Sequence, residues 1–229
     1  MKKQSTLRWA VFSIIFLFSA ATKAQTLKDF FSNEGTNALY LGIDFTLNKV
    51  IDDANANTSD IRDRQYNAIN DLVVNDQRRS GPPSPFHRGN PFDLHWVFHR
   101  TNNMDHDLGL VNERNVKSNA DDIKSTNTSD FHRLKEDDIA KLVREYNFKD
   151  KKGIGILLVS EAMGKSEKAI AIWVTFVDMS TRKVLLTDRV EGRVSMGFGF
   201  ANYWAAGIRN VLEQVEKKEY KDWKGKAGA

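Results

Sequence analysis

The stretch GIGILLVSEAMGKSEKAIAIWVTFVD, residues 153–178, decides the fold of this chain. Residues 153–161 form a short apolar run, and residues 169–178 carry apolar side chains at odd and even positions alike. Strands that are apolar on both faces are typical of the interior of a sheet that is covered on both sides. Residues 163–167 are mostly polar and predict a tight turn, so the stretch predicts two interior strands that follow one another.

The chain after this stretch predicts one more strand and a final helix. Residues 179–182 favour a turn, and residues 184–194 favour a strand that returns antiparallel to the one before it. Asn202 is a typical helix cap, and the following apolar residues recur at helical spacing. We expect this helix to bury Trp204, Ile208, Val211, Leu212 and Val215. The charged tail from Lys217 onward is expected to fray.

The chain before this stretch predicts a further strand and two helices. Residues 39–45 alternate in hydropathy as a strand does, and residues 59–75 fit a helix that Ser59 caps. The acidic residues 136–138 favour a helix start because of the helix dipole. They precede apolar residues at helical spacing, which are Ile139, Leu142, Val143 and Tyr146.

Residues 76–130 are the least regular part of the sequence. The prolines all lie there and predict a loop over residues 80–91. Residues 92–100 are apolar enough to be buried, as either strand or helix. Residues 108–111 are expected to form a short strand, and residues 115–129 a polar loop. The order of the elements predicts one α/β (α+β) domain over residues 25–229, with helices packed on a mixed, mostly antiparallel sheet and an irregular insertion at about 76–130.

Residues 1–24 read as a signal peptide. Lys2, Lys3 and Arg8 precede an apolar run over residues 9–21, and small residues at 22 and 24 predict a cut after Ala24. The run is shorter than the roughly 20 apolar residues that a membrane span needs. We therefore expect a periplasmic or secreted protein with no membrane anchor in its mature chain.

The charge of the mature chain argues against nucleic acid as a partner. The whole chain has 34 basic and 30 acidic residues, and the leader holds four of the basic ones, which leaves 34 − 4 = 30 of each. A protein without net charge has no overall field that would steer it to nucleic acid. The chain has no cysteine, so it forms no disulfide and carries no lipid on a cysteine.

Gly197-Phe-Gly-Phe200-Ala-Asn-Tyr-Trp204 resembles a signature of small exported bacterial proteins of unknown function. The resemblance extends over residues 153–215, with a weaker match at 39–45. More distantly, the last hairpin and helix are similar to the domain shared by the TolB amino-terminal region, the curli-secretion protein CsgG and the penicillin-binding-protein activator LpoB. This resemblance implies a TolB N-terminal/CsgG-like fold and a role in envelope assembly or interaction. The chain departs from CsgG-like and LpoB-like lipoproteins because it lacks their lipid-bearing cysteine, and its long middle segment has no counterpart.

The histidines suggest a metal site but do not define one. They all lie in residues 87–132, as His87, His95, His99, His106 and His132. His95 and His99 would share a face of a helix, and Asp105 and Asp107 flank His106, which would suit a divalent metal. On a strand, however, the first two would lie too far apart to bind one ion, and no His-Glu-x-x-His motif is present. We therefore assign no metal-ligating residue.

The other polar candidates have structural interpretations that we prefer. Gly197 and Gly199 favour a sharp turn before a helix. We expect Phe198 and Phe200 to pack beneath this turn and close the core. The alternative is that the backbone N–H groups of the glycine turn bind an anion. Asp44 and Glu161 lie in predicted strands, where each is expected to meet solvent or an arginine. Trp223 lies among lysines and is expected to be exposed, where it could contact a peptide or the cell wall.

These observations predict an exported, non-enzymatic module that binds another envelope protein or a cell-wall component. We assign no catalytic and no cofactor-binding residue, because no Gly-x-Ser-x-Gly elbow or cysteine nucleophile is present. Two alternatives remain open. One is a metal-dependent hydrolase that uses the histidine-rich middle segment. The other is a carrier that holds a small ligand between the sheet and the proline-rich loop.

Overall fold

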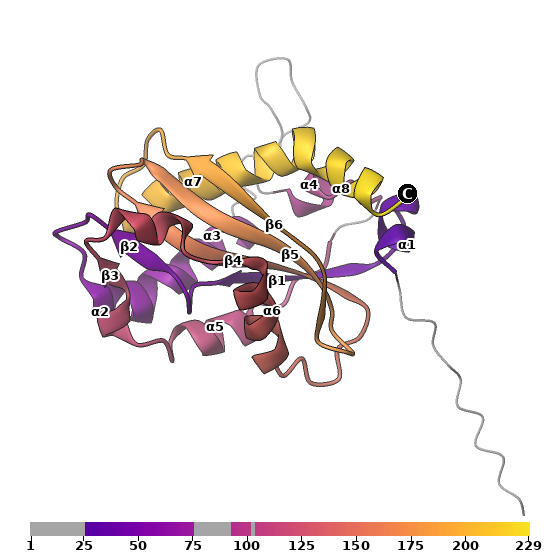
Figure 1. Cartoon of the computed structure of the whole chain (residues 1–229), viewed down its shortest axis with the longest axis horizontal. Helices are drawn as coiled ribbons and strands as arrows, with labels where there is room; N and C mark the ends of the chain where they lie inside the picture. The colour runs from indigo at the N-terminus through magenta and orange to yellow at the C-terminus, as the bar shows by residue number, and fades with distance from the viewer. Residues whose placement is uncertain (1–25, 76–92, 102–103) are drawn as a thin grey trace, which may run out of the picture.

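A computed structural model describes residues 26–75, 93–101 and 104–229. In this part of the chain six strands form one mixed sheet, with helices on both faces (Figure 1). The α/β single-domain prediction is confirmed. The predicted signal peptide, the predicted proline-rich loop and His87 lie outside the described residues. The strands are β1 (Ala38–Asp44), β2 (Lys49–Ile51), β3 (Lys124–Ser125), β4 (Ile154–Gly164), β5 (Ala169–Asp178) and β6 (Lys183–Arg193).

Strand β4 lies at the centre of the sheet, and all of its side chains are buried. On one edge it pairs antiparallel with β5, which in turn pairs antiparallel with β6. On its other edge it pairs parallel with β1 over its first half and with β2 near its end. The short strand β3 then pairs parallel with β2. The interior strands expected from residues 153–178 are therefore present, although β4 runs on to Gly164 and shortens the expected turn.

Two layers of helices cover the sheet. One face carries a long helical segment formed by α7 (Phe200–Gln214), a π-helical turn η5 (Val215–Glu219) and α8 (Tyr220–Lys226), beside α3 (Tyr66–Asn75) and α1 (Leu27–Ser32). The opposite face carries α6 (Glu136–Glu145) and α5 (Gly109–Asn115). No helix in the described residues is long and apolar enough to span a membrane. The expected buried stripes of α6 and α7 are confirmed.

The remaining elements are short. The helix that begins at α2 (Thr58–Asp60) continues through a π-helical turn η1 (Ile61–Gln65) into α3. Helix α4 (Leu94–Val97) packs its Leu94 and Val97 into the core, so the expected burial holds for one face of this segment, whereas Trp96 is 63% exposed. Two 3₁₀ turns, η3 (Ala120–Asp122) and η4 (Thr128–His132), flank β3.

Several local predictions are wrong. Residues 108–111 form the start of helix α5 rather than a strand, and the expected loop at 115–129 contains β3. The side chain of Asn57, not Ser59, caps α2 by accepting a hydrogen bond from the N–H of Asp60. The tail does not fray, because α8 continues the last helix and packs Tyr220 and Trp223 into the core.

Trp223 anchors this tail and is not the exposed residue that its lysine neighbours suggest. Its side chain is 0% exposed, and its ring meets that of Phe176 edge-on at a centroid distance of 5.7 Å. Its Nε1 donates a hydrogen bond to Asp188 Oδ2 at 2.7 Å. The last helix therefore ends in a fixed contact with β5 and β6.

We predict that Trp223→Ala lowers the free energy of unfolding by about 3–5 kcal/mol, because the substitution leaves a large cavity. Trp96→Ala is the matched control: that side chain is 63% exposed, and its loss should change stability by about 0.5 kcal/mol or less. Urea unfolding followed by far-ultraviolet circular dichroism measures both. Equal midpoints for the two variants would mean that the tail frays after all.

Candidate functional site

The buried carboxylate of Asp44 is fully engaged in structural contacts. It lies at the end of β1, where its Oδ2 accepts hydrogen bonds from Arg114 Nε at 3.1 Å and from the hydroxyl of Tyr146. Its Oδ1 accepts a hydrogen bond from the N–H of Thr46 at 2.7 Å. Burial and the adjacent carboxylate raise the pKa of the Tyr146 hydroxyl well above its usual value. The carboxylate of Asp44 therefore takes part in a buried ion pair with Arg114.

Glu161 has the same structural character. It is fully buried in β4, and its Oε2 accepts hydrogen bonds from Arg189 Nε at 2.6 Å and from Trp173 Nε1 at 3.2 Å. Its Oε1 accepts a hydrogen bond from the N–H of Leu134 at 2.6 Å. The expectation that a carboxylate at this position meets an arginine is thus confirmed for Glu161 as well as for Asp44. The sequence did not identify which arginine would serve, because each partner lies far along the chain.

Each of the four described histidines has a different partner. His95 on α4 contacts Asp93, with Nδ1 3.0 Å from Oδ1, whereas His99 follows the helix in a left-handed conformation and stacks on Tyr220. His106 forms an isolated bridge with Tyr40 of β1. His132 lies at the end of η4, with its Nδ1 3.7 Å from Oε1 of Glu191. Within residues 26–75, 93–101 and 104–229, no three histidine, aspartate or glutamate side chains come together as a metal site.

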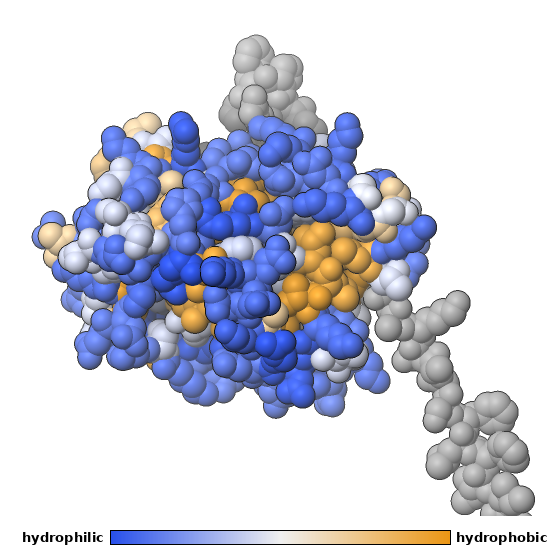
Figure 2. All heavy atoms as spheres, viewed as in Figure 1, coloured by the Kyte–Doolittle hydropathy of each residue, from blue (hydrophilic) through white to orange (hydrophobic). Residues whose placement is uncertain are grey.

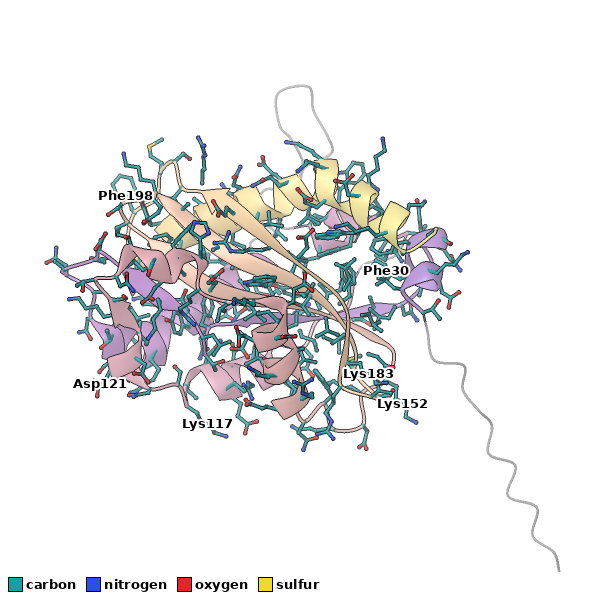
Figure 3. The ribbon with its side chains drawn as sticks, in the orientation of Figure 1. Phe30, Lys117, Asp121, Lys152, Lys183 and Phe198 are labelled. Atoms are coloured by element: carbon teal, nitrogen blue, oxygen red, sulfur yellow. The ribbon has the colours of Figure 1, made fainter. Side chains whose placement is uncertain are left out.

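The turn between β6 and α7 presents an apolar tip, which we define as residues 196–199. Phe198 is 93% exposed and Met196 is 80% exposed. Figure 3 shows Phe198 at the outer margin of the molecule. Phe200 is half-buried and meets Trp204 edge-on. The expectation that Phe198 and Phe200 both seal the core is therefore wrong for Phe198.

The first turn of α7 holds this tip in place. Asn202 does not cap the helix as expected; Gly199 occupies the cap position with a φ of 76°. Asn202 Nδ2 instead donates a hydrogen bond to the carbonyl of Phe198 at 3.1 Å. A Cβ on Gly197 would lie 2.6 Å from the backbone nitrogen of Tyr203, so the loop packs directly on the helix backbone. The apolar side chains are exposed on a supported loop.

A cleft of about 410 Å³ lies beside the tip. It is formed where the chain leaves β2 and β4, at the carboxyl ends of parallel strands, which is where open α/β sheets bind ligands. The ammonium of Lys165 lies 4.1 Å from the ring centroid of Tyr203 and 3.8 Å from Asp53 Oδ2. Asp60 is engaged by Arg64 and Gln65. The charged side chains of the cleft are thus already paired with one another or with neighbours.

A larger cleft of about 680 Å³ opens on the other side of the turn between β4 and β5. Its lining includes Ala169 and side chains of both charge signs, among them Lys168, Glu191 and Arg193. Glu191 forms an ion pair with Arg189, in which its Oε1 lies 2.5 Å from Nη1 of the arginine. Because side chains of both charge signs line this cleft, it resembles a solvated surface hollow more than a site that selects one kind of ligand.

No family model, no curated protein and no solved structure matches this chain. The resemblance of residues 197–204 to small exported proteins, and the more distant one to the TolB, CsgG and LpoB domain, stay predictions. The candidate site therefore rests on the geometry of the tip and of the adjoining cleft. The sequence indicates Gly197 and Gly199 as turn residues but does not single out Met196. The run Ser195-Met-Gly-Phe-Gly199 does suggest that Met196 and Phe198 are exposed, because small residues in a turn offer little surface against which larger side chains can be buried.

We predict that Gly197→Ala lowers stability by about 1–3 kcal/mol, because the added Cβ meets backbone atoms that cannot move aside. Hydrogen exchange should become faster over residues 195–203. Gly225→Ala in α8 is the matched control, since a Cβ there meets nothing, and it should raise helix stability by about 0.5–1 kcal/mol. Unchanged exchange in Gly197→Ala would show that the loop is not held against the helix.

Proposed function

We propose that this protein is an exported, non-enzymatic module that binds another protein of the cell envelope through the apolar tip. The observation that carries the proposal is the exposure of Phe198 on a loop that Gly197 and Asn202 hold in place. A fully exposed aromatic side chain gains about 1.5–3 kcal/mol when a partner buries it. Aromatic side chains that enter a partner's pocket supply much of the energy of protein interfaces.

Three features of the described residues support binding over catalysis. The two buried strand carboxylates are each paired with an arginine, as structural carboxylates are. Among the described residues, no three histidine, aspartate or glutamate side chains come together in the cluster that a metal-dependent hydrolase would need. The predicted signal peptide and the resemblance to envelope-interaction domains favour the same compartment and class of partner.

A small-ligand carrier is the second candidate. The cleft of about 410 Å³ beside the tip favours it, because the cleft lies at the carboxyl ends of β2 and β4. The sequence predicts a ligand held between the sheet and the proline-rich loop, and that loop lies outside the described residues. A thermal-shift screen with small neutral compounds separates the candidates, since a carrier is stabilised by its ligand at concentrations above Kd.

We predict that a photo-crosslinking phenylalanine analogue at position 198 attaches one envelope protein, whereas the same analogue at Val116 attaches none. Val116 is the control because it is 41% exposed and follows α5, away from the tip. Illumination of native cells followed by mass spectrometry identifies the adduct. Excess unmodified protein should suppress the adduct.

The competitor with Met196→Ser and Phe198→Ser should suppress it about 10- to 100-fold less well, because losing the apolar contacts of these two side chains with the partner costs roughly 1.4–2.8 kcal/mol. The double-serine protein keeps its fold because both side chains point into solvent. If it competes as well as the unmodified protein, or if both positions give the same adducts, the tip is not the binding surface.

A further inference from the structure

The outer edge of β6 is closed over only part of its length. In its second half, Gln214 Nε2 of α7 donates a hydrogen bond to the carbonyl of Glu191 at 2.6 Å, and Asn210 Oδ1 accepts one from the N–H of Arg193 at 3.0 Å. The N–H of Arg189 is taken by the carboxylate of Asp188 at 3.0 Å. Side chains thus replace a neighbouring strand from residue 189 onward.

The first half of the edge lacks such partners. Because alternate residues of a strand point their N–H and C=O to the same side, Thr187 continues the outward series of residues 189, 191 and 193. No described residue makes a hydrogen bond to its outward backbone groups. Val184, Leu185 and Leu186 are only partly buried, and Figure 2 shows an apolar area over β5 and β6, ringed by hydrophilic side chains. This edge combines unpaired backbone groups with partly exposed apolar side chains.

Basic side chains flank this part of the edge. Lys152, Arg182 and Lys183 are exposed, and none has an ion-pair partner among the described residues. Their loops touch, since the N–H of Met179 donates a hydrogen bond to the carbonyl of Gly153 at 3.0 Å. Figure 3 shows Lys152 and Lys183 together at the end of the β5–β6 hairpin.

Two carboxylates lie in the same loops, and neither neutralises the cations. Asp178 Oδ1 accepts hydrogen bonds from the N–H groups of Ser180 and Thr181 within its own turn. Asp150 is exposed and has no ion-pair partner among the described residues. Lys151 is already bound to Asp107 at 2.5 Å. The surface therefore keeps a local positive charge although the mature chain as a whole has none.

We propose that residues 183–187 of β6 take up an acidic, extended segment of a partner protein as an added strand. The outward backbone groups supply hydrogen bonds, the apolar side chains supply contact area, and the three cations select carboxylates. The added strand is short, because beyond Thr187 the side chain of Asp188 is held by Trp223 and Lys226 of α8. An anionic lipid surface fits less well, since headgroups attract the cations but offer few donors to the outward carbonyl groups.

This surface is independent of the apolar tip. Phe198 and Lys183 lie at opposite ends of the molecule in Figure 3. The proposal therefore stands or fails separately from the proposed function, and a partner of the tip need not be a partner of the edge.

The test measures binding of a fluorescein-labelled peptide of alternating glutamate and valine to the mature chain by fluorescence anisotropy. The acidic peptide should bind about tenfold or more tightly than its lysine counterpart in low salt. The combined Lys152→Glu, Arg182→Glu and Lys183→Glu variant should reverse this preference. A remote variant with the same charge change should keep it; its substitutions are Arg64→Glu, Lys117→Glu and Lys217→Glu.

Two measurements separate strand addition from simple charge attraction. Thr187→Pro removes one outward N–H at an edge that tolerates proline, and it should weaken the acidic peptide about tenfold. In the unmodified protein, saturating acidic peptide should slow hydrogen exchange of the Thr187 amide. Unchanged exchange at Thr187, or unchanged affinity in a folded Thr187→Pro protein, would overturn the proposal. So would charge-dependent binding to vesicles of equal phosphatidylglycerol and phosphatidylcholine without binding of the peptide.

Discussion

The complete burial of β4 is the constraint on which the rest of the structure depends. A strand of eleven residues without one exposed side chain needs a helical layer on each face and a hydrogen-bonding neighbour along each edge. β5 supplies one edge, whereas β1 and β2 share the other and leave a break between them. Ser160 and Glu161 lie at this break, and side chains from other elements satisfy them. Polar residues thus occur in β4 where its neighbours change, so they do not by themselves indicate chemistry.

The backbone N–H and C=O groups at the edges of the sheet need hydrogen-bond partners, and the two edges obtain them in different ways. At β1, the side-chain amides of Asn70 and Asn115 both bond to the backbone of Ile43, so helices α3 and α5 close the edge with buried amides in place of a strand. At β6, the side chains of α7 close only the second half. A bulge at Leu185 and the flanking cations limit unspecific pairing of the open half. An open edge that is protected by charge admits a partner of opposite charge more readily than a copy of itself.

Long periodic segments could be predicted from the sequence, and short or shifted ones could not. The strands of residues 153–194 and the buried stripe of α7 follow from local hydropathy. Helix α5 is too short to show a period, and its place depends on Gly42, where any Cβ would strike Val111. The prediction that the tail frays is wrong because of the π-helical turn η5, which adds one residue to a helical turn. The next buried residue after Val215 is therefore Tyr220, and this distance departs from the 3.6-residue spacing that marks a buried helix face in a sequence. Such effects arise from tertiary packing and leave no local trace.

The apolar tip is the point at which structural requirements fail to account for the sequence. Gly197 is required because it touches the helix backbone, and Gly199 because its φ is positive. Neither requirement extends to position 198, where the side chain stands in solvent and a polar residue would serve the fold equally well. An aromatic residue at this position exposes apolar surface to water and gains no packing within the chain. Exposed apolar side chains that do not stabilise the fold are expected at functional sites. The two glycines, which the sequence does indicate, form the scaffold, and the residue that we propose for binding is the one that this scaffold exposes.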